Sequence, residues 1–214
     1  MGRVPVGARQ YISNLLILPN SVTNKCAYTW GGEFQSSSYV PGCFTLGVVA
    51  HETSHILDGA ALADVIAADG LPAGTAYSST NHWSGAYNKD TAVITAYARS
   101  SWSESFADTG RFAWSHMVHP GGLGAYNSQW TKVSNQVGNY VGRLRPIIFP
   151  SSGTCTGKVP STVPVRVSNG STSKRWSRDA PRSELDGTGV PEIAKPENVT
   201  AEQFVYNGIA PTLL

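Results

Sequence analysis

Two histidines separated by one helical turn constrain this chain more than any other feature. His51 and His55 lie where apolar residues recur at helical spacing, from Thr45 to a predicted stop at Gly59. Positions four apart share one face of a helix, so both imidazoles can reach a single ion. We therefore predict a helix over 45–59 that presents two nitrogen ligands to a metal.

Glu52 directly follows the first histidine, about 100° further round the same predicted helix. That offset keeps it from being a third ligand, but lets it take a proton from a water bound to the metal. Histidine binds Zn²⁺ at about 2.0–2.1 Å, and the ion lowers the pKa of its water toward about 7. We therefore predict a Zn²⁺ cofactor with Glu52 as the general base.

A catalytic zinc site takes three protein ligands and leaves one position for water. Glu104 is the candidate third ligand, on a separate predicted helix over about 104–117. Asp108 lies four residues later on the same face, so it can accept a hydrogen bond from the far nitrogen of a ligand histidine. Asp58 and Asp64 are the alternatives to Glu104 as the third ligand. The role expected for Asp58 is, however, to hold a ligand in place without binding the metal, or to lie at the end of the helix.

Tyr97 is the candidate for stabilising a developing oxyanion. It lies seven residues before Glu104, at the end of a helix predicted over 90–98 and capped by Asp90. If the chain turns there into the next helix, the hydroxyl can point toward a carbonyl held by the metal. The alternative is that Tyr97 packs in the core beside Ile94.

The pattern His51-Glu52-x-x-His55 followed by Glu104-x-x-x-Asp108 resembles the gluzincin metallopeptidases, the thermolysin-like class. The spacing from the preceding tyrosine to Glu104 looks more like the catalytic domain of anthrax lethal factor. The whole chain is similar to secreted fungal proteins described as conidiation-specific. The resemblance implies a zincin-like core and a zinc-dependent endopeptidase that acts on peptides or proteins.

Two other interpretations stay open. The aspzincin peptidases pair the same motif with an aspartate ligand, but the segment 74–77 lacks the aspartate of their Gly-Thr-x-x-Asp signature. A non-catalytic secreted or cell-surface protein would instead close a structural zinc site with a fourth side chain, Asp58 or His82.

The expected fold is α+β, mainly helical with a small sheet near the N-terminus. Short apolar runs broken by turn residues predict strands within 1–43, and 71–89 is predicted to be a polar loop. Further helices are predicted over 60–69 and from Trp130 to Leu144. A Ser/Thr/Pro-rich tail over 151–214 would follow a metallopeptidase domain over 1–150.

Composition and cysteine usage limit the partners and the compartment. The net charge of +2 and the lack of a long apolar run argue against a nucleic-acid partner and a membrane span. Cys26 and Cys43 are predicted to form a disulfide with Cys155 left over, the alternative being three reduced thiols. Asn169 and Asn198 begin N-glycosylation sequons. We expect a secreted monomer whose leader is absent from this chain.

Overall fold

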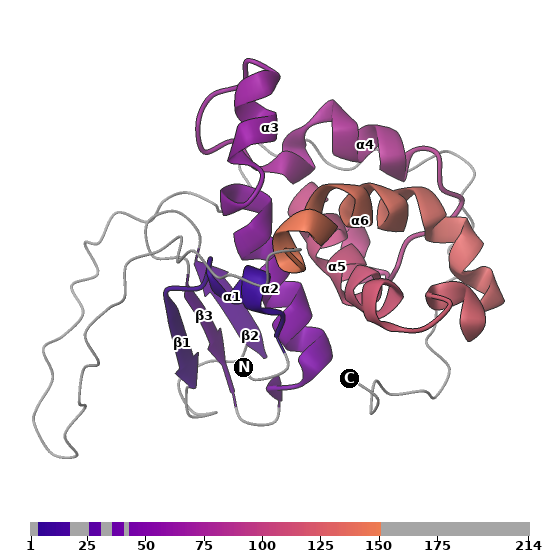
Figure 1. Cartoon of the computed structure of the whole chain (residues 1–214), viewed down its shortest axis with the longest axis horizontal. Helices are drawn as coiled ribbons and strands as arrows, with labels where there is room; N and C mark the ends of the chain where they lie inside the picture. Colours follow the sequence, from indigo (N-terminus) through magenta and orange to yellow (C-terminus); the bar gives the residue numbers. More distant parts are fainter. Residues whose placement is uncertain (1–3, 18–25, 31–35, 41–42, 151–214) are drawn as a thin grey trace, which may run out of the picture.

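A small sheet and a layer of helices make up the protein (Figure 1). The computed structural model describes residues 4–17, 26–30, 36–40 and 43–150, and every structural statement below concerns these residues. The elements before the first long helix are α1 (Val6–Arg9), β1 (Asn14–Ile17), β2 (Ala27–Trp30) and β3 (Ser36–Tyr39). The predicted α+β class is confirmed.

The sheet has the order β1-β3-β2. β1 runs parallel to β3, and β2 runs antiparallel to it with Thr29 opposite Ser37. A disulfide joins Cys26, just before β2, to Cys43, three residues before the first long helix. The predicted pairing is therefore confirmed, and it ties one edge of the sheet to the helical layer.

Two long helices form the centre of the helical layer. Thr45 caps the start of α2 (Leu46–Ala60), and its side chain accepts a hydrogen bond from the Val48 N–H. Ser101 caps the start of α5 (Trp102–Val118), and its side chain accepts one from the Glu104 N–H. Both helices therefore start where a hydroxyl satisfies a backbone donor that has no partner within the helix. The short helix α3 (Ala63–Ala68) lies within the predicted range 60–69.

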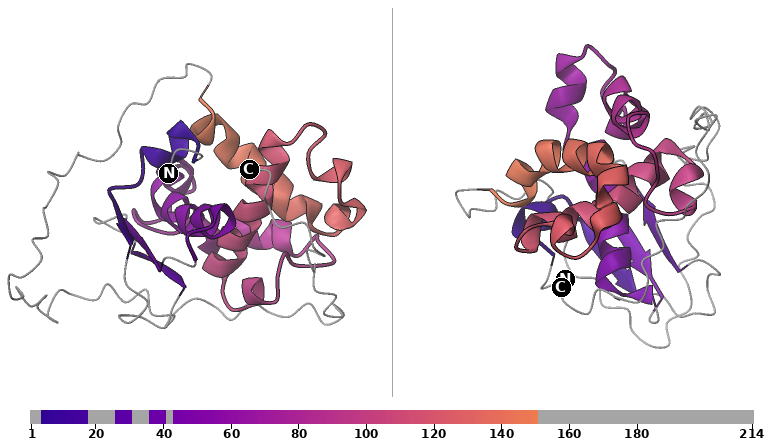
Figure 2. Two further views of the ribbon diagram at one scale, coloured as in Figure 1. Left: turned by 90° about the horizontal axis from the view of Figure 1, so that it is seen from below. Right: turned by 90° about the vertical axis from the view of Figure 1, so that its right-hand side faces the viewer.

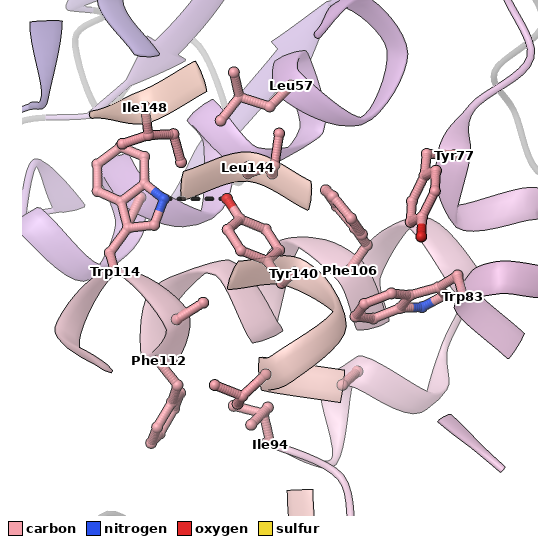
Figure 3. Packing of buried hydrophobic residues seen from close by; sticks show 14 of the residues in the cluster. Leu57, Tyr77, Trp83, Ile94, Phe106, Phe112, Trp114, Tyr140, Leu144 and Ile148 are labelled. Carbon is pink, nitrogen blue, oxygen red and sulfur yellow. Dashed lines mark hydrogen bonds between the residues drawn. The ribbon is translucent and has the colours of Figure 1, made fainter. Parts of the chain in front are cut away.

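α2 lies between the sheet and α5 and contacts both, as the left view of Figure 2 shows. The crossing of α2 and α5 is close because Gly110 faces Ser54, and a Cβ at Gly110 would overlap the Ser54 Oγ. Ser54 donates to the Ala50 carbonyl and pairs with the Tyr140 hydroxyl at 2.7 Å. Trp114 donates its indole N–H to the same hydroxyl at 3.1 Å (Figure 3). A buried polar relay therefore links α2, α5 and the last helix, α6 (Ser134–Ile148).

The apolar core fills the space among α2, α5 and α6. Edge-to-face packing places the Phe106 ring centroid 5.0 Å from that of Trp83, and the Tyr140 ring is 4.9 Å from Phe106 (Figure 3). Trp83 belongs to α4 (Asn81–Tyr87), which lies in the segment predicted to be a loop. Burial of its aromatic side chains, including Tyr87, explains why this segment is helical despite its polar composition.

The helix predicted over 90–98 is wrong. Only a 3-10 turn, η4 (Tyr97–Arg99), forms there. The Asp90 carboxylate instead accepts hydrogen bonds from the backbone N–H groups of Asn135 and Gln136, in the first turn of α6. Asp90 was expected to cap a helix next to it in the sequence, but its carboxylate instead caps the start of α6, far along the chain.

The remaining helical segments differ from prediction at their ends. The segment predicted from Trp130 begins as a 3-10 helix, η6 (Ser128–Val133), and α6 continues past Pro146, which lies in its last turn. Two shorter 3-10 turns, η3 (Tyr77–Ser79) and η5 (Leu123–Ala125), connect neighbouring helices.

Some predictions fall outside the described residues: the tail over 151–214, Cys155, and the sequons at Asn169 and Asn198. Within the described part, every helix is too short or too polar to cross a lipid bilayer.

Candidate metal centre

Three potential ligand atoms converge where α2 crosses α5. The Nε2 atoms of His51 and His55 are 3.2 Å apart, and the Glu104 Oε2 lies 3.0 Å from the first and 3.3 Å from the second. A tetrahedral zinc with bonds of about 2.0–2.1 Å separates its ligand atoms by about 3.3 Å. The spacing of these three atoms therefore fits one face of a zinc coordination tetrahedron.

Hydrogen bonds on the far side of each ring aim the histidines. The His51 Nδ1 is 2.9 Å from the Asp108 Oδ1, and the His55 Nδ1 is 2.9 Å from the Ser103 Oγ. An ionised carboxylate only accepts, so the His51 Nδ1 is the donor, and once Nε2 has lost its proton its lone pair faces inward. The Ser103 hydroxyl can accept from His55 in the same way.

The Glu104 Oε2 is buried and forms no hydrogen bond with any described residue, although both imidazole nitrogens lie at ion-pair distance. Lone pairs on two nitrogens and one carboxylate oxygen repel one another unless a positive charge lies among them. A metal cation or a proton can supply that charge. The donor set of two imidazoles and one carboxylate is one that zinc uses in catalytic sites.

The ionisation of the site follows from the same contacts. Burial lowers the pKa of His51, but the neighbouring carboxylates of Asp108 and Glu104 outweigh it and raise the pKa to about 9. Burial acts to raise the pKa of Glu104, yet the two imidazoles hold it well below its usual range. The pKa of Asp108 is likewise lowered, because His51 and Thr95 outweigh its burial. Both carboxylates are therefore ionised at neutral pH, and their negative charge attracts a cation.

Asp108 is itself held in place by further contacts. Thr95 donates its hydroxyl to the Asp108 Oδ2, and the Arg111 Nη1 lies 3.3 Å from Oδ1. The Thr95 Oγ1 also accepts from the Ala98 N–H at 3.2 Å, which connects Asp108 to η4. Sequence reasoning missed Thr95 as a partner of Asp108, because a short polar residue in an irregular segment gives no periodic signal.

Glu52 points to the sheet side of α2. Its side chain is buried, with 7% of its surface exposed, and its Oε2 accepts a hydrogen bond of 2.5 Å from the Thr29 Oγ1 on β2. Thr29 was not singled out from the sequence, which has no feature that pairs a residue of this strand with Glu52.

Tyr97 lies at the surface beside the three ligand atoms. Its hydroxyl donates to the Glu104 Oε1 at 3.1 Å, and its ring centroid is 6.1 Å from that of His51. Tyr97 is 57% exposed, which contradicts the alternative expectation of a core position beside Ile94. Partial burial and the Glu104 charge raise the pKa of Tyr97 to about 12, so the hydroxyl remains a donor at neutral pH.

The alternative ligands lie elsewhere. Asp58 is buried, and its two oxygens accept hydrogen bonds from the backbone N–H and the hydroxyl of Ser78, while burial raises its pKa to about 6. Asp64 is exposed on α3, and the His82 Nε2 pairs with Asp69 at 2.8 Å. Among the described residues, the potential metal-binding group consists of His51, His55 and Glu104. It includes none of Asp58, Asp64 and His82.

Comparison with known proteins gives one family match. A family model described as "Conidiation-specific protein Con-13" matches residues 1–165. No curated protein and no solved structure matches the chain. The match supports the conidiation-specific part of the resemblance expected from the sequence, and it lends nothing to the metallopeptidase part.

Proposed function

We propose that this chain, which belongs to the conidiation-specific protein Con-13 family, is a secreted zinc-dependent endopeptidase with a zincin-like core. The observation that carries the proposal is the convergence of two inward-facing imidazole nitrogens on a buried carboxylate oxygen that no hydrogen bond satisfies. His51, His55 and Glu104 would hold the metal. Asp108 and Ser103 would orient the two rings from behind.

A catalytic role is favoured by the side chains around the three ligands. When bound, zinc supplies a Lewis acid and makes water acidic enough to be deprotonated near neutral pH. Glu52 has a carboxylate one residue from the first ligand, where it would accept the proton of the attacking water and pass it to the leaving amine. The Tyr97 hydroxyl, which donates its one proton to the Glu104 Oε1 in this structure, would turn from that oxygen to donate to the oxyanion that forms on the substrate carbonyl.

A purely structural zinc site is the second candidate, and the geometry favours it less. Such sites take four protein ligands. In the described part of the chain the group has three, while Asp58 and His82 have partners of their own.

Secretion is part of the proposal. Disulfides form and persist in oxidising compartments, and Cys26 is bonded to Cys43. A monomer acting on peptide or protein substrates is the simplest form consistent with this site, since every proposed role is filled from one chain.

The test compares Glu52→Gln with the wild-type protein, using an unfolded protein substrate and metal analysis of the purified chains. We expect Glu52→Gln to keep about one zinc per chain and to lose cleavage by about 10²–10⁴-fold, since that is the usual contribution of a general base. Asp64→Asn is the control, because it removes an exposed carboxylate remote from the site. Undiminished cleavage by Glu52→Gln, or a zinc bound by four protein ligands in X-ray absorption spectra, would overturn the proposal.

A further inference from the structure

We propose that Thr29 is a positioning residue, which holds the Glu52 carboxylate in the orientation needed for proton transfer. The inference rests on the proposed peptidase function, because it assigns a role to a residue that acts through Glu52. Thr29 lies on β2, and its hydroxyl donates to the Glu52 Oε2 at 2.5 Å. That distance is typical of an O–H donor on an ionised carboxylate, the stronger class of hydrogen bond.

The Thr29 hydroxyl oxygen also accepts a hydrogen bond. The Thr29 Oγ1 lies 3.1 Å from the Ser37 Oγ on β3, and Ser37 is buried. Thr29 has one hydroxyl proton, which goes to Glu52, so Ser37 donates to Thr29. The result is a directed chain from Ser37 through Thr29 to Glu52 that starts inside the sheet and ends at the proposed general base.

One hydrogen bond matters here because a glutamate side chain can rotate about its last bond. Pinning Oε2 to β2 leaves Oε1 as the oxygen that takes a proton from water and later delivers it to the leaving nitrogen. The O–H bond of the water breaks as the O–H bond on Glu52 forms. That O–H bond then breaks as the N–H bond of the leaving amine forms and the peptide C–N bond breaks. Small misplacements of such a group can reduce a rate by up to about 10²-fold.

The scaffold around Thr29 is suited to this task. Its branched side chain restricts rotation about χ1, and β2 is paired with β3 through the register of Thr29 with Ser37. The disulfide between Cys26 and Cys43 ties the start of β2 to the segment that leads into α2, the helix that carries Glu52. Strand and helix are therefore fixed relative to each other close to the contact.

The experiment compares Thr29→Val, which keeps the shape but removes the hydroxyl, with Thr29→Ser, which keeps the hydroxyl. Ser38→Ala is the structural control, because it deletes another buried hydroxyl of the same sheet that donates to the Tyr28 carbonyl. Each variant is assayed for kcat and KM on a peptide substrate and for zinc content. Its crystal structure, with and without zinc, reports the position of the Glu52 carboxylate.

We expect Thr29→Val to lower kcat by about tenfold or more, with KM and zinc content within about twofold of wild type. Its Glu52 carboxylate should leave the position seen next to β2. Thr29→Ser should restore both the rate and the position, and Ser38→Ala should change neither.

Two outcomes would separate the possible failures. If Glu52→Gln is inactive while Thr29→Val matches Thr29→Ser in kcat and in the position of Glu52, the role of Thr29 is refuted and the peptidase proposal stands. If Glu52→Gln cleaves as well as wild type, the peptidase proposal fails and the role of Thr29 in proton transfer fails with it.

Discussion

Replacing Asp108 with asparagine should weaken zinc binding by about tenfold. The Asp108 carboxylate accepts from the His51 Nδ1 at 2.9 Å and is almost fully buried. Asparagine can still accept that bond, but it exchanges a charged acceptor for a neutral one. Charged hydrogen bonds contribute about 1.5–3 kcal/mol and neutral ones about 0.5–1.5 kcal/mol, so the difference of about 1–1.5 kcal/mol corresponds to about tenfold in affinity. That value lies at the lower end of the loss usual for such outer partners, about 10–100-fold.

The assay is a competition titration in which a chromophoric chelator of known affinity takes zinc from the protein near neutral pH. Asparagine also cannot accept from Thr95 through its amide nitrogen, so stability is measured separately by urea unfolding of the metal-free chain. Asp64→Asn serves as the control for loss of one negative charge at an exposed site. A folded Asp108→Asn protein that binds zinc within about twofold of wild type would refute the idea that this carboxylate orients a ligand.

Two further predictions concern proton release and the helix crossing. Since the pKa of His51 is raised to about 9 in the metal-free protein, zinc must displace a proton, so affinity should rise with pH up to about 9 and fall by up to about tenfold per unit below it. Calorimetry in buffers of different ionisation enthalpy counts the protons released, and an affinity unchanged between about pH 6 and 8 would contradict the assignment. Tyr140→Phe should lower the free energy of unfolding by about 1–3 kcal/mol, because the buried Trp114 N–H loses its acceptor. Urea unfolding measures this loss, and a change below about 0.5 kcal/mol would show that the relay does not stabilise the crossing.

Local signals explain what could be predicted about the helices. α2 was expected from the spacing of its apolar residues and α5 from helix start and stop signals, and the side chains of Thr45 and Ser101 cap the two helices. Periodicity and capping depend on residues within a turn or two of each other, so the sequence alone reveals them. The disulfide between Cys26 and Cys43 could also be predicted from the sequence, because closing a short loop between two cysteines costs little entropy.

Competition between distant segments explains the errors. Asp90 was expected to cap a helix beside it, yet its carboxylate binds the first turn of α6. The helix α4 formed where a polar loop was predicted, because Trp83 is fully buried against Phe106 of α5. Neither the contact of Asp90 with α6 nor the burial of Trp83 could be predicted from neighbouring residues. Each depends on a partner that is distant in the sequence and comes near only when the chain folds.

The motif around His51 determined by itself that two imidazoles would share one helix face, since helix geometry fixes that relation within a single turn. Which carboxylate would join them depended on how α2 crosses α5, and Gly110 lets that crossing be close enough for Glu104 to reach both rings. The contact of Thr29 with Glu52 likewise exists only because β2 packs against α2. Contacts between segments depend on packing distances of a few ångströms, which arise from the whole core and not from the spacing of residues along the chain.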